Sequence, residues 1–259
     1  MPAELKSTTQ GRTMVLTLSN PEHRNAMGPE VYAAGVEALN AADSSPEVRS
    51  VVITGAGPWF SAGGNLQRLL ANRQFPPEVQ AQSIEAMHSW VEAIRTFPKP
   101  VIAAVEGAAA GAGFSLALAC DLIVAAEDAV FAMAYASVGL SPDGGATWSL
   151  AHAVPRQLAT ELLMAGERMP ARRLHELGVV NRLVPHGGAL VAALEIAEKL
   201  NERAPNVLAS IKELINDAAG ATLTRQLASE RDQFVRNLHH PNGGIGIEAF
   251  LAKQPPRYQ

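Results

Sequence analysis

The residues that most constrain this chain are 100–121, where a strand, a glycine-rich turn and a helix follow one another directly. The run VIAAV at 101–105 is continuously apolar, which predicts a buried strand. Gly107, Gly111 and Gly113 come next, and only alanine stands between them. The backbone is therefore nearly bare of side chains at this point.

The segment after these glycines, residues 114–120, is apolar and rich in alanine and leucine, and Asp121 closes it. This composition predicts a buried helix. The first N–H groups of a helix have no partner within it, and the helix N-terminus favours negative charge. Because no side chains stand in the way, a ligand oxygen can approach these donors closely. The run therefore predicts an oxyanion site.

Three other interpretations of the glycines remain open at this point. The first is close packing of a helix on a sheet, with no functional role. The second is a dinucleotide-binding fingerprint, since Gly111 and Gly113 form GxG after a strand, although the third glycine is missing. The third is a nucleophile elbow around Ser115, with Asp143 and His152 following in hydrolase order. Against the elbow, several residues separate this serine from the strand end.

Size and composition exclude several classes of protein. The 259 residues suffice for a large core, and 47% hydrophobic with 18% charged residues is typical of a globular protein. The net charge of −4 argues against nucleic-acid or anionic-membrane partners. The uncharged, glycine-rich stretch at residues 107–120 is too short to cross a bilayer. With one cysteine, Cys120, in an apolar segment, we expect a buried thiol and a cytoplasmic protein.

Beyond the glycine run, strands and helices alternate up to residue 188, and only helices follow. The repeated strand–turn–helix pattern favours a stacked or spiral α/β arrangement, with a core at 1–187 and a helical subdomain at 188–259. Apolar runs ended by turns predict strands at 14–18, 48–54, 101–105, 122–126, 129–133 and 179–184. Helical spacing predicts helices from Pro29 (with Tyr32, Val36 and Leu39 on one face), at 84–97, at 148–164 around Pro155, and at 171–177, 190–202, 207–218, 223–238 and 246–253. We expect small residues to open a further helix at 60–66, and the proline-containing segment 72–82 to be irregular.

A second glycine-rich helix start, at residues 62–64, also lies directly downstream of a predicted strand. Two such starts can each place one backbone N–H on a single oxygen. A pair of donors of this kind stabilises a thioester enolate.

Several ordered motifs now match a known family. They are VVITGAGPWFSAGGNL at 51–66, PKPVIAAV at 98–105 with the glycine run behind it, GLSPDGG at 139–145 and GIEAFLAK at 246–253. From Met14 to Lys253 the chain resembles the crotonase, or enoyl-CoA hydratase/isomerase, superfamily. The resemblance implies a crotonase-like spiral of ββα units with a C-terminal all-helical region. It further implies an acyl-CoA thioester substrate, no cofactor beyond that CoA, and a homotrimer or a dimer of trimers.

The resemblance also implies roles for individual residues. Gly64 and Ala112 match the two oxyanion-hole positions and would supply backbone N–H groups. Phe250 and Lys253 match a C-terminal pair that reaches CoA from a neighbouring subunit. The expected substrate-binding residues are Arg24, Ala26, Ala62, Leu66, Ser115, Tyr135, Phe250 and Lys253.

The chain departs from the family pattern where the hydratases carry two glutamates, because Ser115 and Tyr135 stand at those positions. Neither side chain can act as a carboxylate base near neutral pH. Asp143 is the remaining acid in the matching loop and resembles the aspartate of some isomerases and of haloaryl-CoA dehalogenases. Its alternative role is to cap the helix after Gly144. Tyr135 either forms a hydrogen bond through its hydroxyl or serves as an aromatic wall for the acyl group.

We therefore expect an acyl-CoA enzyme that stabilises a thioester enolate and most economically moves a double bond, with Asp143 as the base. The alternatives are hydration or hydrolysis of an aromatic-derived or ring-containing enoyl-CoA, and dehalogenase-like attack by Asp143. A catalytically silent member that only binds acyl-CoA is the remaining alternative. The seven histidines show no metal-ligand spacing, so no metal and no redox cofactor are expected.

Overall fold

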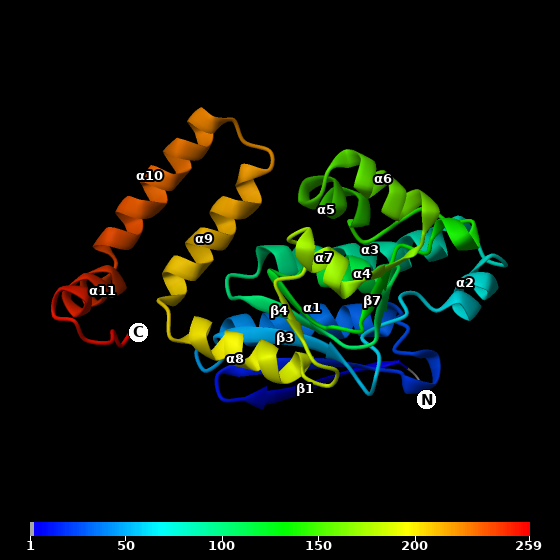
Figure 1. Ribbon diagram of the computed structural model, residues 1–259, viewed down its shortest axis with the longest axis horizontal. Helices are drawn as coiled ribbons and strands as arrows, with labels where there is room; N and C mark the ends of the chain where they lie inside the picture. The colour runs from blue at the N-terminus through cyan, green and yellow to red at the C-terminus, as the bar shows by residue number, and fades with distance from the viewer. Residues whose placement is uncertain (1–2) are drawn as a thin grey trace.

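The computed structural model describes residues 3–259, and its centre is a six-stranded sheet in the order β1-β2-β3-β4-β6-β9 (Figure 1). β1 and β2 form an antiparallel hairpin, whereas every other neighbouring pair in this sheet is parallel. The strands are β1 (Glu4–Gln10), β2 (Thr13–Ser19), β3 (Ser50–Gly55), β4 (Val101–Val105), β6 (Leu122–Ala126) and β9 (Arg182–Val184).

The structure has a second, three-stranded sheet, and the chain passes into it from the first sheet at a glycine. β5 pairs in parallel with β7, which pairs antiparallel with β8. Gly107 lies between β4 and β5 with φ +58°, so the chain turns there from the large sheet into the small one. The chain passes from the large sheet to the small one a second time between β6 and β7. These ββα units confirm the predicted spiral. The strands of the small sheet are β5 (Ala108–Ala110), β7 (Val130–Ala132) and β8 (Arg168–Pro170).

Helices cover both faces of the large sheet, which explains why its inner strands β3, β4 and β6 are mainly apolar. Ile53 and Ala103 face the main core with α1, α3 and α4, whereas Val52 and Ile102 face the alanines of α8. The helices are α1 (Pro29–Ser44), α2 (Leu66–Asn72), α3 (Pro77–Thr96), α4 (Ala112–Ala119), α5 (Ala146–Ala153), α6 (Arg156–Ala165), α7 (Ala171–Glu176), α8 (Ala189–Asn201), α9 (Pro205–Ala218), α10 (Leu223–His239) and α11 (Pro241–Leu251).

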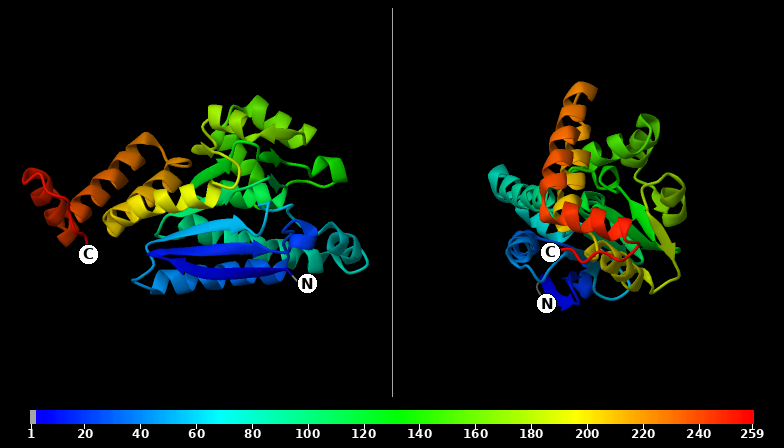
Figure 2. Two further views of the ribbon diagram at one scale, coloured as in Figure 1. Left: turned by 60° about the horizontal axis from the view of Figure 1, so that its bottom comes forward. Right: turned by 90° about the vertical axis from the view of Figure 1, so that its left-hand side faces the viewer.

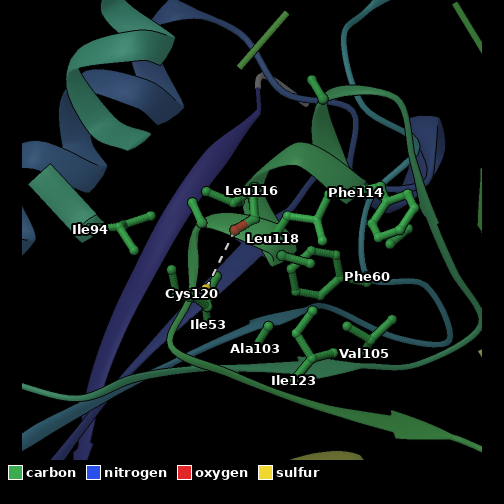
Figure 3. Close-up of a cluster of buried hydrophobic side chains, with 14 of the residues drawn as sticks. Ile53, Phe60, Ile94, Ala103, Val105, Phe114, Leu116, Leu118, Cys120 and Ile123 are labelled. Atoms are coloured by element: carbon green, nitrogen blue, oxygen red, sulfur yellow. Dashed lines mark hydrogen bonds between the residues drawn. The ribbon is translucent and has the colours of Figure 1, made fainter. Parts of the chain in front are cut away.

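Helix α4 lies at the centre of the main core, as Figure 3 shows. All of its residues are buried, which fits its apolar composition on every side. Phe114 packs against Phe131 with ring centroids 4.9 Å apart. Cys120 follows directly and is buried, and the burial raises the pKa of its thiol. The expected buried thiol is confirmed.

Three strands were missed by the sequence patterns, each for a physical reason. β1 is polar and mostly exposed at the sheet edge, so it carries no apolar alternation. β5 consists of three alanines inside the glycine run, which a composition reading assigns to the turn. β8 is only three residues long and ends at Pro170, a residue that ordinarily indicates a turn.

Several helix starts also differ from the expectation, and one of them is that of α11, which begins at Pro241 instead of residue 246. The segment 60–66 is not helical until Leu66, because Asn65 caps α2 there and accepts a hydrogen bond from the Arg68 N–H. The prediction that residues 72–82 are irregular is wrong, because α3 already begins at Pro77. Proline favours the first helical turn, and so the second proline of this segment starts the helix.

The C-terminal helices α9, α10 and α11 project from the core as an arm (Figures 1 and 2). Residue 188 does mark the onset of the all-helical region, but α8 still packs on the sheet, so the projecting part begins with α9. Lys212 ties α9 to the core, because its Nζ donates to Asp121 Oδ2 and to the Ile94 carbonyl, both at 2.8 Å. Between residues 3 and 259, no helix is long and apolar enough to cross a membrane.

Candidate active site

The loop that follows β3 lies beside the segment that follows β4, and their backbones are hydrogen-bonded to each other as in neighbouring parallel strands. Ser61 bonds on both sides to the β5 backbone, its N–H to Ala108 O at 3.0 Å and its carbonyl to Ala110 N at 2.9 Å. Gly63 has φ +91°, and a Cβ there would lie 2.5 Å from the Ala110 oxygen and 3.1 Å from the Ala112 nitrogen. Glycine is therefore required for this close approach.

The close approach leaves two backbone donors next to each other. Ala112 is the first residue of α4, so its N–H has no acceptor within the helix. In the other loop, Gly63 donates to Ser61 Oγ at 3.1 Å, and its carbonyl accepts from Met27 N at 2.7 Å. The Gly64 N–H donates to no acceptor within the described part of the chain. Both predicted oxyanion residues thus present free donors.

Gly64 and Ala112 line a cavity of about 770 Å³, which is large enough for an organic ligand. Among the described residues that line it, Asp143 is the only acid. The walls come from α1, α2, α3 and the loop that ends at Asp143. A larger groove of about 1100 Å³ lies between the β1–β2 turn, α8 and residues 255–258, and it contains none of these groups. The apolar part of the cavity wall includes Leu66, Leu69, Leu70, Phe75, Ile84, Met87, Val138 and Leu140.

The Asp143 carboxylate is held in one orientation by tyrosine. The Tyr135 hydroxyl donates to Asp143 Oδ1 at 2.6 Å and lies 3.3 Å from Ser115 Oγ. Burial, and next the negative charge of Asp143, raise the pKa of Tyr135, so its hydroxyl remains a protonated donor. Asp143 Oδ2 accepts no hydrogen bond from the residues the structure describes. One carboxylate oxygen is therefore fixed and the other is available.

Comparison with known proteins decides the family. Residues 8–259 match the family model described as Enoyl-CoA hydratase/isomerase. The chain belongs to this family. It is 35% identical over 246 residues to the 1,2-epoxyphenylacetyl-CoA isomerase of Escherichia coli K12, covering 95% of this chain and 94% of that one. It is 32% identical over 257 residues to the 2,3-dehydroadipyl-CoA hydratase of the same organism, covering 99% of both.

The solved structures agree. A crystal structure of an enoyl-CoA hydratase from Polaromonas sp. JS666 matches with a TM-score of 0.98 and 68% identity, over 99% of this chain and 100% of that one. A structure from Geobacillus kaustophilus HTA426 matches with a TM-score of 0.92 and 32% identity, over 99% of this chain and 98% of the other. The crotonase fold is therefore shown, and the dinucleotide-binding interpretation of the glycines is wrong.

The helix-capping alternative for Asp143 is wrong in this family member. The N-cap of α5 is Gly145, and no side chain caps this helix. Gly144 has φ +58°, and a Cβ there would lie 2.4 Å from Met87 Cε and 3.0 Å from Ser115 Cβ. This glycine lets the loop pack closely on α3 and α4, and thereby holds Asp143 at the cavity.

The nucleophile-elbow alternative is wrong as well. Ser115 is buried inside α4 and does not line the cavity. Its hydroxyl donates to the Asp143 carbonyl at 3.1 Å, and the Gly111 carbonyl at 3.3 Å is the alternative acceptor. His152 lies on the exposed face of α5, where its Nδ1 is 2.7 Å from the Trp148 carbonyl. A serine–histidine pair is therefore absent from the described site. The expected contact of Ser115 with substrate is replaced by support of Tyr135 and of the Asp143 loop.

The other predicted substrate-binding residues divide into two groups. Ala62, Leu66 and Tyr135 line the cavity. Arg24 and Ala26 do not: the Arg24 guanidinium lies 5.4 Å from the Trp59 ring centroid, and Ala26 is buried.

Phe250 and Lys253 lie at the end of the arm, on α11 and just behind it, and do not line the cavity of their own chain. Phe250 is 83% exposed. In Figure 1, α11 and α2 lie at opposite ends of the molecule. Contact of this pair with CoA therefore requires the cavity of a second copy.

The sequence patterns did not predict several polar residues of the cavity, among them Tyr32 on α1 and Arg68 on α2. Tyr32 was expected on the apolar face of its helix, and it is indeed only 3% exposed, but its ring also reaches the cavity. Arg68 carried no signal, since an isolated arginine in a short helix is ordinarily solvated.

Proposed function

We propose that this acyl-CoA enzyme moves a double bond of its thioester substrate, with Asp143 as the base. The observation that carries the proposal is a single, oriented carboxylate in the cavity that also holds the Gly64 and Ala112 donors. The 35% identity to an isomerase acting on an acyl-CoA supports the same reaction class.

In the proposed reaction, the thioester oxygen accepts hydrogen bonds from the Gly64 and Ala112 N–H groups. Asp143 removes a proton from the carbon next to the carbonyl or from the γ carbon, and the electron pair moves toward the thioester oxygen. The two donors and the N-terminus of α4 stabilise the resulting negative charge. Asp143 then returns the proton to the other carbon, so one C–H bond breaks, another forms and the double bond shifts.

Proton shuttling by one carboxylate needs no second acid, whereas the two-glutamate hydration implied by the family resemblance does. Ser115 and Tyr135, at the glutamate positions, form a hydrogen-bonded pair that supports Asp143. Because proton transfer within one molecule is redox-neutral, the proposal requires no metal and no cofactor other than the CoA of the substrate. We also propose a cytoplasmic location, which the single buried cysteine fits.

Exchange of protons with heavy water tests the reaction. When the protein is incubated in heavy water with a panel of aliphatic and aromatic enoyl-CoA esters, the thioesters should incorporate deuterium and be converted to isomers without addition of water. Mass spectrometry measures the deuterium content, and chromatography separates the isomers. Water adducts as the main product would instead identify a hydratase. Binding without any exchange would identify a catalytically silent member.

We propose further that the protein assembles as a homotrimer or a dimer of trimers through its arm. The exposed apolar side chains of α9–α11 support this, because such surface is ordinarily covered. They include Ile215, Leu223, Leu227, Phe234 and Leu251.

Light scattering measures the assembly directly. Wild-type protein should have the mass of a trimer or of a multiple of it. Phe234→Asp, which puts a charge on the 70% exposed ring position of α10, should lower that mass. Asp232→Asn on the same helix is the control and should leave the mass unchanged. A stable wild-type monomer with full turnover would contradict both the assembly and the shared CoA pocket.

A further inference from the structure

The hydroxyl of Tyr32 has no hydrogen-bond partner within residues 3–259, although the residue itself is largely buried. The residue is 3% exposed and lines the acyl cavity. Burial, with the charge of Asp143 next, raises the pKa of Tyr32 to about 12, so the group is a donor at physiological pH. Because this hydroxyl belongs to a residue that lines the cavity and is unpaired, it is a donor available to a polar atom of a ligand.

Arg68 brings a positive charge to the same wall. Its Nη2 donates to the Ser83 hydroxyl at 3.0 Å, and its buried Nε has no partner. Among the described residues, none offers a carboxylate within 4.0 Å of the guanidinium. When a half-buried cation is paired only with a neutral hydroxyl, its positive charge is not neutralised.

Tyr32 lines the same cavity as the reacting carboxylate and this arginine. Three charges act on its hydroxyl, since Asp143 and Glu30 raise the pKa of Tyr32 and Arg68 lowers it. Along the cavity wall formed by α2 and α3, Arg68 and Arg73 are basic, and no acid lines the cavity apart from Asp143. The part of the cavity beyond Asp143 is thus positively charged and rich in donors.

We propose that Tyr32 and Arg68 form a subsite for a carboxylate at the far end of the acyl group, so that the substrate is a CoA thioester of a dicarboxylic acid. This inference rests on the proposed function, because it takes the acyl group to enter the cavity past Asp143. A carboxylate neutralises the guanidinium and accepts from both donors, whereas a hydroxyl would leave the charge uncompensated. Tyr32 is nearly closed to solvent, which places the subsite inside the cavity, away from the hydrated phosphates of CoA.

Equilibrium binding of saturated thioesters tests the subsite without turnover. Isothermal calorimetry compares ω-carboxyacyl-CoA esters of about four to eight carbons with unsubstituted acyl-CoA esters of equal length. The readout is the ratio of the two dissociation constants. At the best-fitting length, wild-type protein should bind the carboxylated ester on the order of 30-fold more tightly.

The variants should change this ratio in a defined order. Arg68→Met should bring it close to one, Arg68→Lys should recover part of it, and Tyr32→Phe should lower it several-fold. Gln67→Met, on the same helix but outside the cavity, is the matched control and should keep the wild-type ratio. If Arg68→Met does not fold, the other two variants still report on the ratio.

Three outcomes decide the inference. A wild-type ratio near one at every length overturns it. Equal weakening of both esters by the Arg68 variants also overturns it, because the arginine would then hold the CoA portion that both esters share. A clear carboxylate preference in a protein that shows no exchange in heavy water upholds the subsite and refutes the proposed isomerisation.

Discussion

Asp143→Asn should lower turnover on the order of 100-fold or more, with little change in melting temperature or in CoA binding. The amide keeps an oxygen that can accept from the Tyr135 hydroxyl, as Oδ1 of Asp143 does at 2.6 Å. It loses the basic carboxylate that the proposed proton transfer needs. Steady-state kinetics, thermal melting and calorimetry with CoA measure the three quantities.

Ser115→Ala is the control for this prediction. Ser115 lies behind Tyr135 and does not line the cavity, so its loss should be mild. If Asp143→Asn retained turnover while Ser115→Ala abolished it, the assignment of the base would fail. A loss of stability in step with activity would mean that Asp143 acts mainly in holding the loop.

Ala112→Pro should reduce kcat by about 100- to 1,000-fold, because it deletes one of the two proposed oxyanion donors. The position tolerates proline unusually well, since Ala112 is the first residue of α4 and its N–H has no role in the helix. Gly111 precedes it and has no Cβ to clash with the proline ring. Fold retention is checked by circular dichroism, and kcat by the isomerisation assay.

Ala112→Gly is the matched control, because it changes the side chain and keeps the N–H. It should retain most of the turnover. A folded Ala112→Pro variant with wild-type kcat would show that the thioester oxygen is not bound at the start of α4. The Asp143 prediction would be unaffected, and so the two halves of the proposed site are tested separately.

The sequence predicted the parts of the fold that depend on burial. The β4 run, the glycines and α4 are apolar or bare because they lie at the centre of the core, and that pattern is visible without coordinates. β1 could not be found in this way, since it is exposed and is specified by pairing with β2. Pairing partners leave no trace in local composition.

The residues of the candidate site likewise fall into a group that the sequence predicted and a group that it did not. Gly64, Ala112 and Asp143 stand in recognisable motifs, and the structure brings them to one cavity. Tyr32 and Arg68 belong to helices whose periodic pattern indicates only which face is apolar. Their approach to Asp143 depends on how α1 and α2 pack, which spacing along the chain does not encode.

The tyrosines that flank Asp143 also set how the protein responds to alkali. Free tyrosine titrates near pH 10, but in the folded protein the pKa of Tyr32 is about 12 and that of Tyr135 is raised as well. Above pH 10 the unfolded chain therefore releases both protons while the folded chain keeps them. Each tyrosine then lowers the free energy of unfolding by about 1.4 kcal/mol per pH unit. Alkaline denaturation is thus driven by ionisation of the unfolded chain, while the Tyr135–Asp143 hydrogen bond is still intact in the folded one.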